Sequence, residues 1–311
     1  MLQTTNHILM VRPTAFKMNA ETAVNNYFQK EINATNANIN AQAQEEFDAF
    51  VKILQQAGVN VLVVSDVPNS NNPDSVFPNN WVSFHQDGTV ALYPMFAENR
   101  RGERREETLA FLESQGFIIN EIVDYTAAEE AMLFLEGTGS LLLDRVNKIA
   151  YCALSPRADE DLVIEFCEDF EYTPILFTAN QTVQGKRLPI YHTNVMMCLA
   201  ETFAVICLEC IDDKKEQREI IKQLQNTNKE IITITEAQMH QFAGNMLQVK
   251  GANNQLYLVM SQAAKQSLTN NQIEKIEAHC PILSSPLTTI ETCGGGSARC
   301  MMAEVFLPKQ A

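Results

Sequence analysis

The hydrophobic and polar positions of this chain repeat one alternation several times. A segment with apolar residues at i, i+3 and i+4 is followed by a short break and then by a run of β-branched or apolar residues. This pattern predicts a helix followed by a strand. Glycines end the first two amphipathic segments, as expected for helix stops. The predicted helix and strand pairs are residues 47–58 and 59–64, 106–116 and 117–119, 160–170 and 174–176, 214–225 and 231–234, and 272–279 and 281–283.

The predicted strands recur at a nearly constant interval. With one residue of each strand as a marker, the intervals are 57, 57, 56 and 51 residues along the series Val61, Ile118, Ile175, Ile231 and Ile282. A fixed period is typical of repeat architectures, and modules that each hold strands and a helix predict a closed α/β ring. No stretch rich in Pro, Gly or Ser divides the chain. We expect one catalytic domain over residues 1–311, built from five repeats of roughly 55–60 residues. An ordinary α/β fold with evenly spaced helices is the alternative.

A polar residue lies at a similar place in each repeat. The offsets from the strand marker are 19, 18, 17, 14 and 18 residues for Asn80, Glu136, His192, Asn245 and Cys300. Modules related by rotation would bring equivalent positions together at the axis. The spacing therefore predicts that a cysteine, a histidine and a carboxylate from different modules face one cavity.

Cys300 is the predicted nucleophile. It follows Gly294, Gly295 and Gly296 in the segment Cys-Gly-Gly-Gly-Ser-Ala-Arg-Cys. Consecutive glycines allow unusual backbone angles and close approach of a ligand, and the N–H groups of such a loop can stabilise a developing anion. A buried structural thiol is the alternative. Cys293 is the competing nucleophile, but it precedes the glycines.

His192 and Glu136 are the predicted acid/base and its carboxylate companion. His192 enters an apolar run, where a core histidine would be the ordinary interpretation, but its place in the repeat favours catalysis. Imidazole donates and accepts protons near neutral pH. Glu136 directly follows apolar residues, and a buried carboxylate needs a fixed partner, such as a substrate nitrogen. A helix cap or a surface turn is the alternative for Glu136.

Composition and charge argue against several other classes of function. The net charge of −15 disfavours nucleic-acid and anionic-membrane partners, because both need clustered Lys and Arg. The N-terminus has no signal-peptide pattern, and no apolar run is long enough for a membrane helix. We therefore expect a cytoplasmic protein whose eight cysteines are reduced. The lone Cys-x-x-Cys of Cys207 and Cys210 predicts buried thiols instead of a zinc or redox site.

Taken together, these motifs resemble the guanidino-group-modifying superfamily of arginine deiminases, dimethylarginine dimethylaminohydrolases and amidinotransferases. The resemblance covers nearly the whole chain, through residues 11–13, 77–81, 136–139, 155–157, 192 and 293–300. It implies an α/β fold of the pentein type, a five-bladed ββαβ propeller with pseudo-fivefold symmetry. The chain is most similar to the bacterial amidinotransferase-like branch linked to citrulline utilisation.

The resemblance also implies roles for the three catalytic candidates. Cys300 would attack the planar carbon of a ureido or guanidino group, His192 would move protons, and Glu136 would hydrogen-bond a substrate nitrogen. A covalent thiol adduct would form, ammonia or an amine would leave, and water would release the product. This mechanism needs neither a metal nor an organic cofactor.

The resemblance further implies a pair of arginines that bind the substrate carboxylate. Arg157 matches one such clamp, and Arg101, or its neighbour Arg100, would supply the second. Guanidinium groups suit this task because they bind carboxylates in bidentate fashion. The choice between substrate contact and scaffold turn stays open for Asn26, Asn245 and Arg12.

Two departures from the deiminase pattern concern the substrate. Deiminases have aspartates, which grip a cationic guanidinium, at the positions of Asn80 and Asn194. An amide can donate a hydrogen bond to a ureido oxygen, whereas a carboxylate cannot, and loss of both charges would weaken guanidinium binding. We therefore expect hydrolysis of L-citrulline to ornithine, carbon dioxide and ammonia.

Other functions stay open at this point. An arginine dihydrolase is the first alternative, followed by an arginine deiminase or methylarginine hydrolase. Amidinotransferase activity would need an amine acceptor, which nothing in the sequence identifies. A catalytically dormant binding protein on the same scaffold is the alternative from another class. The expected partner is a small amino acid, citrulline or an arginine derivative, and a homodimer is an open alternative for the assembly.

Overall fold

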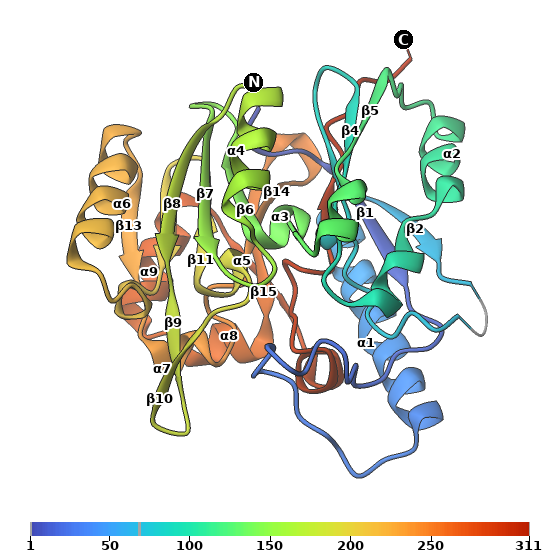
Figure 1. The fold of residues 1–311 in the computed structure, drawn as a ribbon, viewed down its shortest axis with the longest axis horizontal. Coiled ribbons are helices and arrows are strands. Elements are labelled where there is room, and N and C mark those ends of the chain that lie inside the picture. The colour runs from blue at the N-terminus through green and yellow to red at the C-terminus, as the bar shows by residue number, and fades with distance from the viewer. Residues whose placement is uncertain (1, 68–69, 311) are drawn as a thin grey trace.

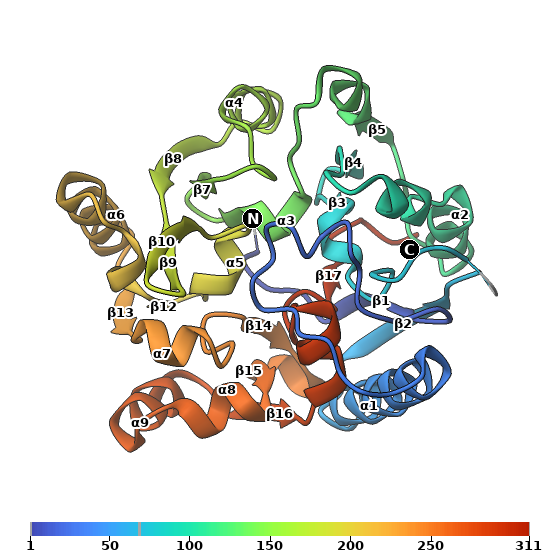
Figure 2. The ribbon, with the colours of Figure 1, turned by 60° about the horizontal axis from the view of Figure 1, so that its bottom comes forward.

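Five small three-stranded sheets surround a common axis as the blades of a propeller (Figures 1 and 2). The computed structural model describes residues 2–67 and 70–310, so both end residues of the predicted 1–311 domain lie outside the described residues. In every blade the middle strand is antiparallel to the strand nearest the axis and parallel to the outermost one. The structure thereby confirms the five-bladed α/β propeller.

The strands of each blade are consecutive along the chain, except in the blade that holds both ends. From the axis outward the blades are β3 (Val82–Phe84), β4 (Thr89–Leu92) and β5 (Glu121–Asp124); β6 (Leu141–Asp144), β7 (Ile149–Leu154) and β8 (Thr173–Thr178); β11 (Met197–Leu199), β12 (Phe203–Ile206) and β13 (Glu230–Thr233); β14 (Leu247–Lys250), β15 (Leu256–Ser261) and β16 (Ile282–Ser285); and β17 (Ala303–Glu304), β1 (His7–Arg12) and β2 (Asn60–Ser65). A hairpin of β9 (Asn180–Val183) and β10 (Lys186–Pro189) projects from the ring (Figure 1).

The two ends of the chain close the ring. Ile8 and Leu9 of β1 pair with Glu304 and Ala303 of β17 in antiparallel register, and β1 also pairs with β2 in parallel. One blade is therefore assembled from the first and last strands. The segment before β17 carries Cys300, so this closure also positions the predicted nucleophile.

A helix on the outside of the ring joins the middle and outer strands of each blade. These helices are α1 (Asn36–Gln56), α2 (Glu106–Ser114), α4 (Glu160–Asp169), α6 (Lys214–Asn226) and α9 (Asn270–His279), the last preceded by the short α8 (Gln262–Ser267). Side-chain oxygens cap the first turns of four of them, from Thr35, Asp159, Asp213 and Thr269. Such caps satisfy backbone N–H groups that have no partner within the helix.

All five predicted helices are confirmed, with one clear difference in length. The first begins at Asn36 instead of residue 47, because Thr35 caps it and its polar first half buries only Ile39 and Ala43. A polar stretch of this kind shows little of the apolar spacing on which the prediction relied.

Four predicted strands are confirmed, and the prediction for residues 117–119 is wrong. The outer strand of that blade is β5, which begins at Glu121. Phe117 instead forms an isolated bridge with Lys309, and the N–H of Ile118 donates to Pro308. The C-terminal tail thus takes the backbone hydrogen bonds of this apolar run, which a local pattern cannot reveal. Among residues 2–67 and 70–310, no helix has the length and apolarity needed to cross a bilayer.

Candidate active site

The strand of each blade nearest the axis is preceded by a polar turn. Three of these turns line one small cavity, through Asn80, His192 and Cys300, and the other two contact them through Glu136 and Asn245. The turns before β3, β6, β11, β14 and β17 contain Asn80, Glu136, His192, Asn245 and Cys300. The one-turn helices α3 (Gly137–Ser140) and α5 (Thr193–Met196) begin directly after the glutamate and the histidine. Equivalent positions of the five modules therefore converge, as the spacing predicted.

Cys300 lies in the wall of this cavity together with Asn80 and His192. It is 3% exposed. Its Sγ lies 3.2 Å from Nδ2 of Asn245 and 3.6 Å from Nδ2 of Asn194. Cys293 instead lines a separate hollow at the surface. The geometry therefore supports Cys300 over Cys293 as the nucleophile.

The glycines before Cys300 are needed where their loop packs closely against Asn26. A π-helical turn, Ile290–Gly294, ends at Gly295, whose φ of 63° lies in the left-handed region. A Cβ at Gly295 would lie 2.6 Å from both amide atoms of Asn26. The Asn26 side chain donates to the carbonyl oxygens of Gly294 and Gly295. Glycine thus allows both the backbone angle and the close approach.

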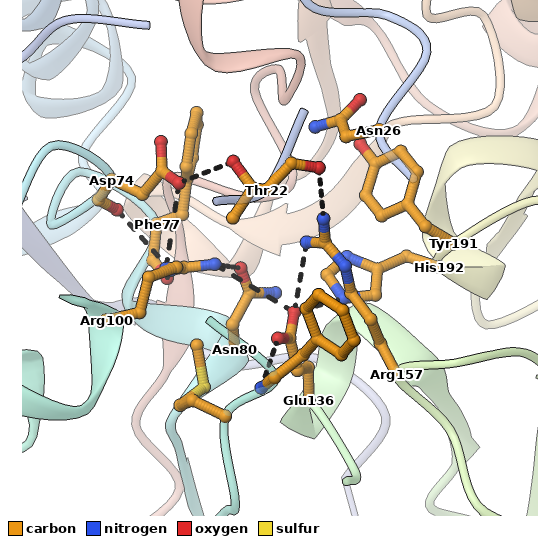
Figure 3. A network of polar contacts seen from close by, with 12 residues as sticks. Thr22, Asn26, Asp74, Phe77, Asn80, Arg100, Glu136, Arg157, Tyr191 and His192 are labelled. Atoms are coloured by element: carbon orange, nitrogen blue, oxygen red, sulfur yellow. Dashed lines mark hydrogen bonds and ion pairs between the residues drawn. The ribbon is translucent and has the colours of Figure 1, made fainter. Parts of the chain in front are cut away.

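His192 and Glu136 form a buried hydrogen-bonded pair (Figure 3). Nε2 of His192 lies 2.7 Å from Oε2 of Glu136. Burial lowers the pKa of His192 to about 4, although Glu136 acts in the opposite direction. Burial alone would raise the pKa of Glu136, but Arg157, His192 and Arg100 outweigh it and hold that pKa well below its usual range. At neutral pH a neutral imidazole therefore donates Nε2–H to an ionised carboxylate, which leaves Nδ1 as the acceptor of the ring.

Arg157 lines the same cavity beside Glu136. Its Nη1 lies 3.4 Å from Oε2 of Glu136. Its Nε and Nη2 donate to Oδ1 of Asn25, and Nη2 also donates to the carbonyl oxygen of Thr22 at 2.9 Å. The guanidinium carbon lies 4.8 Å from the centre of the Tyr191 ring. The arginine is thus fixed in a position where its outer N–H groups meet acceptors of the protein itself.

Residues 13–35, which join β1 to α1, run over one face of the ring near its axis and are called the lid segment below (Figure 2). Thr22 and Asn25 of the lid segment hold Arg157, and Asn26 lines the cavity. Phe28 anchors the lid segment between the rings of His240 and Phe242. The enclosed cavity measures about 10 Å³, which admits about one water molecule. In this conformation the cavity is therefore too small for an amino-acid substrate.

Arg100 fixes the direction of the Asn80 amide (Figure 3). Nη1 of Arg100 donates to Oδ1 of Asn80 at 2.9 Å. Because a guanidinium has only donors, its partner must be the amide oxygen, so the orientation of this amide is determined. Nδ2 of Asn80 is buried and has no hydrogen-bond partner within the described residues. A ligand in the cavity would therefore meet an N–H donor from Asn80.

Gly139 leaves the space in which Asn80 and His192 approach each other. A Cβ at this position would lie 2.4 Å from Nδ2 of Asn80 and 2.8 Å from Nδ1 of His192. Any larger residue at this position would collide with both side chains, so glycine is needed to seat the amide and the imidazole side by side.

The structure does not bring Arg101 to the cavity, and that prediction needs correction. Nε of Arg101 donates to the carbonyl oxygen of Met95 and lies 3.3 Å from a carboxylate oxygen of Glu129. Arg100 lines the cavity instead. The two arginines are consecutive in the 3₁₀ turn Glu98–Glu103, so their side chains point to different sides.

Arg100 is itself committed to protein partners. Its Nε and Nη2 donate to the two carboxylate oxygens of Glu103, both at 2.9 Å. Nη2 also approaches the carbonyl oxygens of Asp74 and Phe77. With these bonds and the one to Asn80, the geometry makes Arg100 a positioning residue instead of a free clamp for a carboxylate.

Asp74 is another residue of the cavity wall, and no motif or repeat position distinguishes it in the sequence. Its Oδ2 accepts hydrogen bonds from Asn19 and Thr22, whereas Oδ1 is buried without a partner in the described part of the chain. Burial raises the pKa of this carboxyl. Asp74 lies in a loop of Asn, Pro and Ser that reads as an ordinary turn. Of the residues left open, Arg12 is part of the scaffold, because it pairs with Asp48 of α1.

The residues around the cavity fit nucleophilic chemistry at a planar carbon. A thiol, an imidazole with a free acceptor nitrogen, and an amide donor come together within one enclosed space. A hydrolysis by this route divides one difficult step into two easier ones. Over residues 2–67 and 70–310, no three His, Cys, Asp or Glu side chains are grouped as a metal site would require.

Comparison with known proteins identifies the family. Residues 12–307 match the profile of the eukaryotic N,N-dimethylarginine dimethylhydrolases. The chain belongs to this family. The dimethylarginine dimethylhydrolases are penteins of the guanidino-modifying superfamily, so the resemblance inferred from the motifs is confirmed. The family is named for a hydrolysis of non-peptide C–N bonds. No curated protein matches it at the level of sequence.

Solved structures share the fold of this dimethylarginine dimethylhydrolase family member at low sequence identity. The arginine dihydrolase ArgZ of the cyanobacterial ornithine–ammonia cycle superposes with a TM-score of 0.75 at 19% identity, over 98% of this chain and 41% of ArgZ. Its substrate-bound N-terminal domain gives 0.71 at 18% identity, over 97% and 99%. A dimethylarginine dimethylaminohydrolase adduct with S-methyl-L-thiocitrulline gives 0.63 at 17%, over 97% and 99%. The chain thus spans about two fifths of full-length ArgZ.

Proposed function

We propose that this chain hydrolyses L-citrulline to ornithine, carbon dioxide and ammonia, with Cys300 as the nucleophile. The observation that carries the proposal is the fixed amide of Asn80, whose unpartnered Nδ2 borders the cavity while Oδ1 is held by Arg100. A ureido oxygen accepts a hydrogen bond from this donor. A guanidinium has only donors and would place N–H against N–H. A site that pairs the polar groups of one substrate rejects an analogue that leaves them unpaired.

The surroundings of Cys300 support a neutral substrate group. The polar side chains that the structure records against Sγ are the amides of Asn194 and Asn245. Neither amide carries the negative charge that would pair with a guanidinium. Hydrogen bonds between neutral groups are about half as strong as charge-assisted ones. Of the two carboxylates near the cavity, Glu136 is already paired with His192 and Arg157, and Asp74 is assigned below to the ammonium group of the substrate.

Arg157 and Asp74 supply a charge pattern suited to the other end of an α-amino acid. Both line the cavity. Arg157 would bind the carboxylate in place of Asn25 and Thr22, since a guanidinium binds two carboxylate oxygens in parallel. The free Oδ1 of Asp74 would accept from the ammonium group. A cation and an anion facing one closed cavity fit a zwitterion better than a simple urea.

The reaction follows from these positions. Sγ of Cys300 forms a bond to the ureido carbon while Asn80 stabilises the oxygen, which gains negative charge. His192 passes the thiol proton from Nδ1 to the leaving nitrogen, a C–N bond breaks, and a carbamoyl thioester remains. Water, deprotonated by His192, then attacks the same carbon and displaces the thiolate. The resulting carbamic acid loses carbon dioxide, so citrulline and water yield ornithine, carbon dioxide and ammonia.

The proposal is tested by product analysis with separate substrates. Purified wild-type protein and Cys300→Ala are each given L-citrulline, L-arginine or dimethylarginine, and ornithine, citrulline, ammonia and dimethylamine are measured. We expect ornithine and one ammonia per citrulline, lost in the variant. Ornithine with two ammonia from arginine would instead establish a dihydrolase, and citrulline from arginine a deiminase. Turnover of no substrate would leave the chain a binding protein on an enzyme scaffold.

Hydrolysis of dimethylarginine is the second candidate, because the chain belongs to the family named for that reaction. The product distinguishes the two. Dimethylarginine would yield citrulline and dimethylamine, whereas citrulline hydrolysis consumes citrulline. The released amine and the fate of citrulline therefore decide between the candidates in one assay.

A further inference from the structure

Asn245 is the closest recorded polar neighbour of the Cys300 sulfur. Its Nδ2 lies 3.2 Å from Sγ, whereas Nδ2 of Asn194 lies 3.6 Å away. Both residues are buried. Asn245 precedes β14, at the position in its module that corresponds to Asn80, Glu136 and His192 in theirs. Its place in the repeat and its contact with Sγ are independent observations that point to the same site.

The Asn245 amide can be oriented in only one way. Oδ1 accepts the backbone N–H of Arg299 at 3.0 Å. A backbone N–H is a donor, so the atom it meets must be the amide oxygen, and the other end of the amide is the NH₂ group. One hydrogen of that group is directed to the carbonyl oxygen of Asn194 at 3.1 Å, and the other is available to Sγ. Three of the four hydrogen-bonding positions of the side chain are thus engaged.

We propose that Asn245 is a catalytic residue that stabilises the thiolate form of Cys300 by an N–H donor and aims it at the cavity. A hydrogen bond to an ion is stronger than one to its neutral form, so a donor placed against sulfur favours the thiolate, which is the nucleophile. The bond to the N–H of Arg299 ties this donor to the residue directly before the nucleophile. Sulfur and amide therefore keep their mutual position if the lid segment moves.

The test compares alkylation of Cys300 in wild-type protein and in Asn245→Asp. An aspartate preserves size and the acceptor for Arg299, but it replaces the donor against sulfur with negative charge. Iodoacetamide is applied from pH 6 to pH 10, and mass spectrometry follows the peptide that contains Cys300. At pH 7 we expect alkylation at least about tenfold slower in the variant, in line with the loss of a hydrogen bond to a charged group. At pH 10 we expect the two rates to agree within about twofold, because high pH forms the thiolate in either protein.

Recovery of the alkylation rate at high pH distinguishes stabilisation of the thiolate from a purely structural role of Asn245. Equal rates at every pH would overturn the proposal, and so would a deficit of the same size at every pH, which would indicate altered packing alone. Asn120→Asp makes the same chemical change in a solvent-exposed turn, where Nδ2 donates to the Asp87 carbonyl, and should leave the profile unchanged. Asn245→Ala removes the donor without adding charge and should give a smaller deficit with the same recovery if the aspartate variant does not fold.

The proposal rests on the proposed function only for the identity of the nucleophile. Iodoacetamide reports on the thiol without any substrate. A protein that shows the expected alkylation profile but no turnover of citrulline would retain the role of Asn245 and refute the choice of substrate. Turnover of citrulline together with a pH-independent effect of Asn245→Asp on alkylation would support the choice of substrate and refute the role of Asn245.

Discussion

Asn25 and Arg157 are 132 residues apart in the chain, yet one side-chain oxygen of Asn25 accepts hydrogen bonds from both Nε and Nη2 of Arg157. A carboxylate binds a guanidinium through neighbouring N–H groups of the same kind. In the closed structure the lid segment therefore supplies an acceptor where the proposed function needs a substrate carboxylate. Lid and substrate compete for the same arginine.

We expect Asn25→Ala to lower KM for citrulline about tenfold with little change in kcat. The variant removes an acceptor that must be displaced on binding, and a hydrogen bond to a charged group has a net value of about 1.5–3 kcal/mol. Steady-state kinetics with ornithine detection measures both constants. Val24→Ala is the matched control in the lid segment, because Val24 is 64% exposed. A higher KM in Asn25→Ala would show that Asn25 assists the bound substrate instead of competing with it.

Exchange of Asn80 for aspartate should reverse the preference for the substrate. In Asn80→Asp one carboxylate oxygen still meets Arg100, and the other replaces the free N–H donor. A ureido oxygen would then face a negative charge, whereas a guanidinium would gain a charged acceptor. We expect kcat/KM for citrulline to fall about 100-fold, from the unpaired acceptor and the added repulsion.

Competition between citrulline and arginine tests the second half of the prediction for Asn80→Asp. Arginine should inhibit Asn80→Asp at lower concentration than it inhibits the wild type, as shown by inhibition constants measured side by side. Asn120→Asp again serves as the control for an asparagine exchanged outside the cavity. Unchanged discrimination between citrulline and arginine in Asn80→Asp would remove the principal support for a ureido substrate.

The repeat and most of its elements could be predicted because each module has to bury one apolar face. The helices α2, α4 and α6 show their 3.6-residue period in the sequence and begin at the predicted residues. The wrong prediction at residues 117–119 has a non-local cause, since Phe117 pairs with Lys309 from the other end of the chain. Local periodicity contains no information on such a partner.

The candidate site could be predicted only where residue type and position in the repeat agreed. Cys300, His192, Glu136 and Asn80 are residues of this kind, because an unusual side chain recurs at one offset. Arg100 and Arg101 have identical chemistry and adjacent positions, so only the turn geometry decides which one meets the cavity. The lid segment lacks regular structure and any repeat, and therefore its contacts with Arg157 were not predictable.

His192 should make the stability of the protein depend on pH in acid. Burial lowers its pKa from 6.5 to about 4, so between these values the unfolded chain binds a proton that the folded protein does not. Stability then falls as the pH falls through this window and is fully present above pH 6.5. Each unit corresponds to about 1.4 kcal/mol, so the loss from pH 7 to pH 5 attributable to this residue is about 2 kcal/mol.

Two carboxyl groups change the stability of the folded protein in the opposite direction over the same pH range. Burial raises the pKa of Glu103 and of Glu291 to about 7. For these groups the folded protein binds protons more readily than the unfolded chain, so each favours folding as the pH falls from 7 towards 4.5. The total pH dependence therefore mixes opposing contributions, and only a comparison between variants isolates that of His192.

The comparison uses urea denaturation of wild-type protein and His192→Gln at pH 7 and at pH 5. Because the glutamine cannot titrate, the variant should lose about 2 kcal/mol less than the wild type over this interval. If His192→Gln instead loses more stability than the wild type between the two pH values, folding raises the pKa of His192 and the ring is protonated in the folded protein. The neutral imidazole with a free Nδ1, on which both proton transfers of the proposed reaction depend, would then be refuted.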